Sequence, residues 1–186
     1  AYEQDESQGI LNIADSARLD MAGNFYIGRH GDATINQTGG HIEVGGQIRM
    51  PENALGSGVW NMSGGSATAH GNSYIGLYGP GELNLSGPST TLTFAGGVFE
   101  LGYSAAGTVN QNGGTIEVND SHVVLARNAN GSAVYDLSGG VLKTTGTTAG
   151  QNRRIHMAWG HVDATATMNV RGTGQLVVNE HDASGN

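Results

Sequence analysis

The chain has 186 residues, among which 32 are glycine, only 3 are proline and none is cysteine. Its 8 basic and 16 acidic side chains give a net charge of −8, which disfavours a role that neutralises the phosphates of DNA or RNA. No apolar run approaches the roughly 20 residues that cross a bilayer, so we expect no membrane span. The chain starts at Ala1 without a hydrophobic leader, as expected of a processed or trimmed chain.

A short motif recurs along the chain and is the main indicator of its fold. It consists of an apolar residue, Asn, an apolar residue or Gln, any residue, Gly and usually a second Gly. Copies begin about 25 residues apart, and a longer last interval indicates an insertion around residues 145–154 in the sixth coil. The copies are LNIADS from Leu11, INQTGG from Ile35, WNMSGG from Trp60, LNLSGP from Leu83, VNQNGG from Val109, YDLSGG from Tyr135 and MNVRGT from Met168. We expect a polar extension over residues 1–9 and one repeat domain over residues 10–186.

Two alternations of apolar and polar residues follow the motif. Ile42-Glu43-Val44 is an example of the first, and Phe99-Glu100-Leu101 is an example of the second. A period of two is typical of strands, so each coil should contain three short strands. A leucine-rich repeat would show LxxLxL, and a propeller blade would need about 40 residues. The sequence therefore predicts an all-β, right-handed parallel β-solenoid of about seven coils, with the handedness taken from parallel crossover connections in general.

One motif position forms a column of amides along the predicted rod. Stacked amides can hydrogen-bond along the axis, so we expect a structural ladder that points outward unless the corner turns it inward. Two glutamines, Gln37 and Gln111, occupy the following apolar position and should be buried and hydrogen-bonded. The ladder comprises Asn12, Asn36, Asn61, Asn84, Asn110, Asp136 and Asn169.

The Gly-Gly motif copies and the segments YIG, at Tyr26 and Tyr74, and LGY, at Leu101, carry a family resemblance. They resemble the autotransporter-associated β-strand repeats of large secreted bacterial proteins and passenger-type β-helices, from Ile10 to Val178. The resemblance implies a secreted or cell-surface solenoid and carries over no catalytic residue. Because such proteins usually have many more coils, the chain is expected to be a fragment or a small stand-alone member.

The sequence assigns no catalytic residue, metal ligand or cofactor. Asp20 and Glu43 should be neighbours, with a separation that suits a retaining glycosidase and a repulsion that raises one pKa, but a solvated acidic patch explains them better. Lys143, which a lyase would need as a base, should instead pair with Glu117. The 7 histidines show no HxH or HExxH spacing.

The third strand of each coil should carry aromatic and arginine side chains on its outer face. Tyr26, Arg49, Tyr74, Glu100, Val124 and His156 form one expected outward column, and Arg29, Glu52, Leu77, Tyr103, Arg127 and Trp159 form a second. We expect two cation–π sandwiches, Tyr26–Arg49–Tyr74 and Tyr103–Arg127–Trp159. The alternative is that the exposed aromatic rings bind a glycan chain or another protein.

The last coil remains strand-like, which suggests association through the ends of the rod. We expect the edge formed by Leu176, Val177 and Val178 to contact the first coil of a second copy, between Leu11 and Met21. The expected function is therefore an extracellular or bacterial cell-surface structural protein that associates end to end into a filament or surface assembly. The alternatives are a glycan-binding or adhesive module of a larger secreted protein, which would bind polysaccharide, and, less favoured, a polysaccharide lyase or hydrolase. Acidic residues outside the repeats could repel across a junction, namely Glu3, Asp5, Glu6, Glu180 and Asp182.

Overall fold

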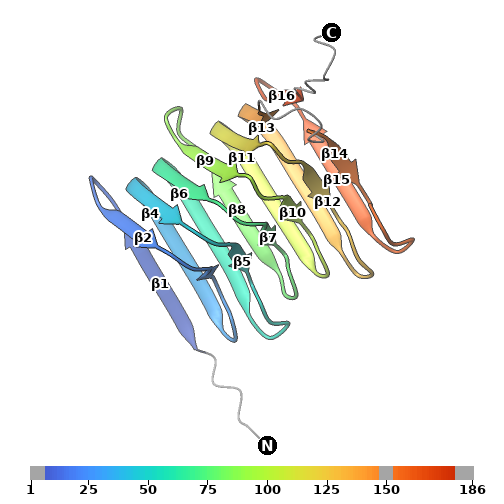
Figure 1. The fold of residues 1–186 in the computed structure, drawn as a ribbon, viewed down its shortest axis with the longest axis horizontal. Helices are drawn as coiled ribbons and strands as arrows, with labels where there is room; N and C mark the ends of the chain where they lie inside the picture. Colours follow the sequence, from blue (N-terminus) through green and yellow to red (C-terminus); the bar gives the residue numbers. More distant parts are fainter. Residues whose placement is uncertain (1–6, 147–152, 179–186) are drawn as a thin grey trace, which may run out of the picture.

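The protein is an all-β parallel solenoid with about six turns of roughly 25 residues each. The computed structural model describes residues 7–146 and 153–178, and every regular element within these ranges is a strand. Figure 1 shows the coils side by side along the long axis, with β1 and β15 at opposite ends. The predicted parallel β-solenoid is confirmed.

Two sheets run the length of the rod, and every strand pairing in them is parallel. The larger sheet contains β1 (Gln8–Ile13), β2 (Arg18–Met21), β4 (Asp32–Val44), β6 (Ser57–Ala69), β8 (Gly81–Leu85), β9 (Thr91–Ala95), β11 (Ala106–Asn119), β13 (Ser132–Thr145), β15 (Thr165–Val170) and β16 (Gln175–Val178). The smaller sheet contains β3 (Phe25–Tyr26), β5 (Ile48–Met50), β7 (Ser73–Ile75), β10 (Phe99–Leu101), β12 (Val123–Leu125) and β14 (Ile155–Met157).

The number of complete turns follows from the smaller sheet. It has six strands, one for each of the first six motif copies, whereas the seventh copy contributes only β15 and β16 within the described residues. The expected seven coils are therefore six complete turns and a seventh of two strands. The first strand begins at Gln8, two residues before the expected start of the solenoid at Ile10.

The Gly-Gly pair forms a corner that lets one strand bend instead of ending. In β4, β6, β11 and β13 the two arms remain one continuous strand with a register shift at the corner. The second glycine is left-handed, with φ of 77° at Gly65. A Cβ atom there would lie 2.4 Å from the carbonyl oxygens of Gly39 and Gly40 in the preceding coil. Glycine is therefore required by backbone conformation and by the close stacking of coils.

Strand alternation places aliphatic side chains inside the rod, where equivalent positions stack. Leu101 pairs in register with Leu125, and both are fully buried. Phe94 and Phe99 stack with ring centroids 4.5 Å apart. The buried Gln111 donates to the carbonyl of Val141 at 3.0 Å and accepts a hydrogen bond from the Tyr135 hydroxyl at 2.6 Å. Gln37 is also buried and donates to the Ser66 carbonyl at 2.9 Å, as the sequence predicts.

Candidate functional site

The amide column lies on the outer face and forms a hydrogen-bonded ladder. Strand pairing aligns all seven of its members, from Asn12 through Asp136 to Asn169. Each amide Nδ2 donates to the Oδ1 of the preceding coil: Asn36 to Asn12 at 3.0 Å, Asn61 to Asn36 at 3.0 Å, Asn84 to Asn61 at 2.9 Å and Asn110 to Asn84 at 2.8 Å. The ladder therefore has a direction, with its donors toward the N-terminal end of the rod.

Asp136 interrupts this ladder. A carboxylate has no N–H to donate, so Asp136 cannot repeat the bond that the amides make to the preceding coil. It accepts from Asn169 Nδ2 at 2.7 Å and lies 3.7 Å from the guanidinium of Arg171. The Glu82 carboxylate can also only accept, and it lies 3.3 Å from Asn110 Nδ2. It therefore favours the orientation in which the Asn110 amide nitrogen faces Asn84. The ladder thus consists of a long N-terminal run and a short C-terminal pair.

Only one of the two predicted cation–π sandwiches forms. Arg127 lies 5.9 Å from the Tyr103 ring centroid and 4.6 Å from that of Trp159. Arg49 approaches Tyr26 at 5.8 Å, but its guanidinium is engaged by Gln47 and Glu52 at 2.7 and 2.5 Å. The predicted contact of Arg49 with Tyr74 is replaced by an edge-to-face contact between Tyr74 and Tyr103, with centroids 5.4 Å apart.

The register of the third-strand column is as expected, but parts of the two outer columns are buried. Glu100 is 2% exposed, and Val124 and Leu77 are also buried. The side chain of Arg127 reaches Glu100, with its Nε 2.9 Å from a carboxylate oxygen, which makes an ion pair. Burial raises the pKa of Glu100 to about 7, and the charge of Arg127 opposes this rise. Alternation gives the direction of a side chain but not what its neighbours cover.

Two histidines extend this cluster beside Trp159. The His156 ring stacks on Trp159 with centroids 4.6 Å apart, and His122 makes an edge contact with His156 at 5.2 Å. Burial lowers the pKa of both imidazoles, and nearby arginines lower it further. The neighbouring His156 also lowers the pKa of His122. The neutral rings therefore act as aromatic packing groups near neutral pH.

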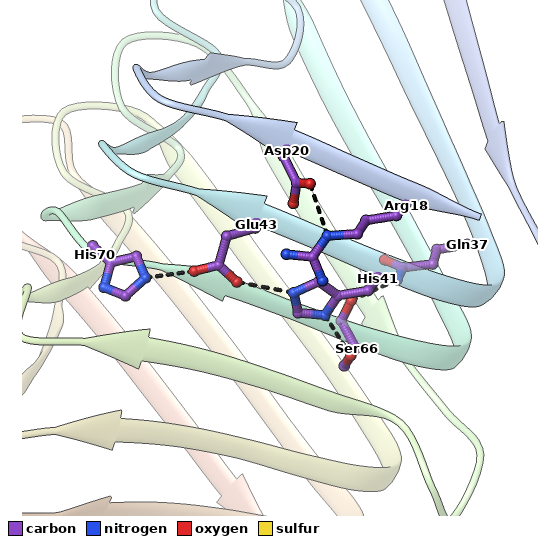
Figure 2. Close-up of polar contacts among 7 residues, drawn as sticks. All are labelled: Arg18, Asp20, Gln37, His41, Glu43, Ser66 and His70. Atoms are coloured by element: carbon purple, nitrogen blue, oxygen red, sulfur yellow. Dashed lines mark hydrogen bonds and ion pairs between the residues drawn. The ribbon is translucent and has the colours of Figure 1, made fainter. Parts of the chain in front are cut away.

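A second polar cluster spans the first three coils (Figure 2). Glu43 accepts from two imidazoles, His41 Nε2 at 2.9 Å and His70 Nε2 at 2.6 Å. The other nitrogen of His41 lies 2.8 Å from the Ser66 hydroxyl. Asp20 pairs with Arg18 at 2.7 Å.

These contacts lower, rather than raise, the pKa of one member of the acidic pair. Asp20 and Glu43 are in register, but hydrogen bonds from His70 and His41 hold the pKa of Glu43 below its usual value, whereas repulsion was expected to raise one pKa. Sequence reasoning missed this network, although a visible signal exists. Each of the two carboxylates has a basic residue two positions earlier, Arg18 or His41, and such residues share a strand face.

The order hydroxyl, imidazole, carboxylate in this cluster resembles a hydrolase triad in connectivity alone. The imidazole of His41 turns Nδ1 toward Ser66, whereas the serine-protease arrangement uses Nε2. Glu43 is in addition shared with His70. The cluster is best explained as a network that ties three coils together. Across residues 7–146 and 153–178, no group of three or more His, Cys, Asp or Glu side chains could hold a metal ion.

Three further expectations concern the partner of Lys143, the insertion in the sixth coil and the acidic residues outside the repeats. The predicted pair of Lys143 and Glu117 is present, with atoms 3.0 Å apart. Of the expected insertion at 145–154, residues 147–152 lie outside the described residues. Arg153, at its end, is fully buried and pairs with Asp120 at 3.0 Å. The acidic positions Glu3, Asp5, Glu6, Glu180 and Asp182 also lie outside the described residues.

The C-terminal coil exposes inner-column side chains whose counterparts are buried in the second to sixth coils. Inner-column residues Val170, Leu176 and Val178 are 46%, 39% and 44% exposed. Their counterparts one coil earlier, Leu137, Leu142 and Thr144, are fully buried. Among the described strands, β15 and β16 pair only with β13, so their outer edges have no strand partner there.

The N-terminal coil is open in a complementary way. β1 and β2 pair only with β4 among the described strands. The inner residues Leu11, Leu19 and Met21 are partly buried, and Ile10 on the outer face is 71% exposed. A recess of about 210 Å³ opens there, lined in part by Leu11, Phe25 and Ile27. Within residues 7–146 and 153–178, both ends of the rod thus present apolar surface and strand edges.

Comparisons with known proteins leave the function to be inferred from these surfaces. A scan against protein-family models matches no family, and searches of curated proteins and of solved structures find no match. The described ranges contain no helical segment capable of crossing a membrane. The β-solenoid fold rests on the strand pairing of this chain itself.

Proposed function

We propose that this chain is an extracellular structural repeat protein whose solenoids associate end to end. The observation that carries the proposal is the exposure of inner-column side chains at the C-terminal coil, where Val170, Leu176 and Val178 are 39–46% exposed. Equivalent residues elsewhere are covered by the next coil, and the open N-terminal coil supplies such a cover. Burial of apolar area and pairing of strand edges both favour this contact.

The extracellular or cell-surface location rests on the sequence resemblance to autotransporter-associated repeats and passenger-type β-helices. A structural role, rather than a catalytic one, is supported by the ion pairs and hydrogen bonds that the charged side chains make with one another. Glu43 is held by two histidines, Glu117 by Lys143 and Glu100 by Arg127. These carboxylates are occupied by partners that join neighbouring coils.

Glycan binding is the second candidate, favoured by the open surface around Trp159. This ring is 44% exposed and borders a recess of about 330 Å³ with Arg127, Asn128 and Gly160. The chain has 2 tryptophans, and Trp60 is buried, so fluorescence quenching by added polysaccharide would report on Trp159. The Trp60→Phe variant would isolate that signal. Against this candidate, Arg127 and His156 already contact the ring.

Electron microscopy and light scattering over a concentration series test the end-to-end proposal. We expect rods that lengthen with protein concentration, and also with salt if the acidic terminal residues repel. Leu176→Lys should prevent this growth, because it places a charge in the apolar junction. Thr167→Lys is the matched control, since Thr167 lies on the outer face of the same coil. A monodisperse monomer at high concentration and high salt would refute the proposal.

A further inference from the structure

We infer that the copies join head to tail in one register, in which Asn12 of one copy continues the amide ladder from Asn169 of another. This inference rests on the proposed end-to-end association and specifies its contact surface. The partner is a second copy of this chain. Three features support it: the direction of the ladder, the chemistry of the inner columns and the charges of the outer columns.

The ladder ends in a complementary pair of atoms. Asp136 can only accept, so Asn169 must turn its Nδ2 toward Asp136, which directs its Oδ1 toward the open C-terminal end. At the other end Asn12 uses its Oδ1 to accept from Asn36, which directs its Nδ2 toward the open N-terminal end. A head-to-tail junction brings this donor to that acceptor. A tail-to-tail junction would instead bring two Oδ1 atoms together.

The inner columns agree with the same register. Strand pairings carried through the rod make Leu11 equivalent to Met168, and Leu19 equivalent to Leu176. Four apolar pairs would therefore stack across the junction: Met168 on Leu11, Val170 on Ile13, Leu176 on Leu19 and Val178 on Met21. A slip of one residue would turn the inner residues of one strand toward the outside, so burial selects this register.

The outer columns meet without repulsion between like charges. In this register Asp20 lies beside Val177, and Arg18 lies beside Gln175. Arg18 already neutralises Asp20 within its own coil. Since the two surfaces in contact are different, the contact is heterologous and can repeat indefinitely along the axis.

Disulfide trapping tests the register directly, because the chain has no cysteine. The double variant Asp20→Cys with Val177→Cys should form a ladder of covalent oligomers under oxidation, since parallel neighbours lie about 4.8 Å apart and disulfides span Cα distances of about 4.4–6.8 Å. The matched control, Arg18→Cys with Val177→Cys, is offset by two residues and should not form a ladder. Within one copy the two cysteines lie at opposite ends of the rod.

The outcomes separate this inference from the proposed function. Rods in the microscope without cross-linking of the in-register pair would refute the register and leave end-to-end association intact. Dimers of the single variant Val177→Cys would show tail-to-tail contact and refute the polarity. Monomers alone would refute the proposed function and this inference together.

The Asn12→Asp variant tests the ladder itself. A carboxylate still accepts from Asn36 within the chain but cannot donate to Asn169 of a neighbour. The variant should keep the stability of the monomer and raise the concentration needed for assembly by about two- to tenfold, the effect of one hydrogen bond. Unchanged assembly would show that the ladder does not cross the junction.

Discussion

Leu142 and Leu176 are neighbours in one inner column, yet Leu142 is fully buried and Leu176 is 39% exposed. Both follow a Gly-containing corner and both lie in strands of the same sheet. They differ in the cover that the described residues provide, since Leu142 has a described coil on each side and Leu176 has one on one side only. A solenoid residue is therefore buried by the next repeat, and the free energy of its burial at the last coil is available to a partner.

The largest effect should come from deleting a side chain in a complete coil. Leu125→Ala should lower the free energy of unfolding by about 2–5 kcal/mol, because Leu125 is fully buried between Leu101 and Met157 in its column. Leu176→Ala in dilute monomer should cost about 1 kcal/mol or less. Chemical denaturation measures both. Equal losses would contradict the difference between the inner and the terminal coil.

Glu100 should make the central coils sensitive to pH. Its pKa in the folded protein is about 7, raised from 4.5, so the neutral form favours folding and its contribution is lost as pH rises through about 7. In Glu100→Gln this loss should disappear, which would make the variant relatively more stable at pH ~8 than at pH ~4. Thermal unfolding at several pH values measures the effect. A destabilisation of Glu100→Gln that grows as the pH rises would indicate instead that the ion pair with Arg127 stabilises the fold.

Asp136 separates the long N-terminal run of the ladder from its C-terminal pair, and an amide at this position should close the break. Asp136→Asn supplies an Nδ2 donor toward Asn110 and still accepts from Asn169, so it should stabilise the monomer by about 0.5–1.5 kcal/mol. The cost is the exposed pair with Arg171, whose atoms are 3.7 Å apart. The reverse change, Asn61→Asp, should destabilise by a similar amount. Denaturation midpoints that move the same way for both would contradict this account.

The smallest effect is expected at Glu43 in the first coils. Its pKa is lowered in the folded state by His70 and His41, so its stabilising contribution is present above about 4.5 and is lost as pH falls through the lower folded value. Glu43→Gln should therefore be less stable than the unmodified chain near neutral pH. The two should converge in acid. A difference that persists below the folded pKa would show that packing, rather than charge, is responsible.

The repeat itself could be predicted from the sequence, because stacking converts a spacing of about 25 residues into strand pairing. The alignment of Asn12, Asn36 and Asn61 and the burial of Gln37 and Gln111 follow from that spacing and from alternation. Contacts between coils were predictable where both partners lie in one column, as for Lys143 and Glu117.

Only the tertiary structure decided what covers each outer face and which partner a long side chain selects. Glu100 alternates outward but is buried with Arg127, and Arg49 turns from Tyr74 to Glu52. The repeat determines backbone positions to within one strand spacing, whereas a long arginine side chain can reach several columns. Its choice depends on the summed charge, burial and packing of neighbours that are distant in sequence. The direction of the amide ladder was decided in the same way, because only the structure shows Glu82 and Asp136 as the acceptors that orient Asn110 and Asn169.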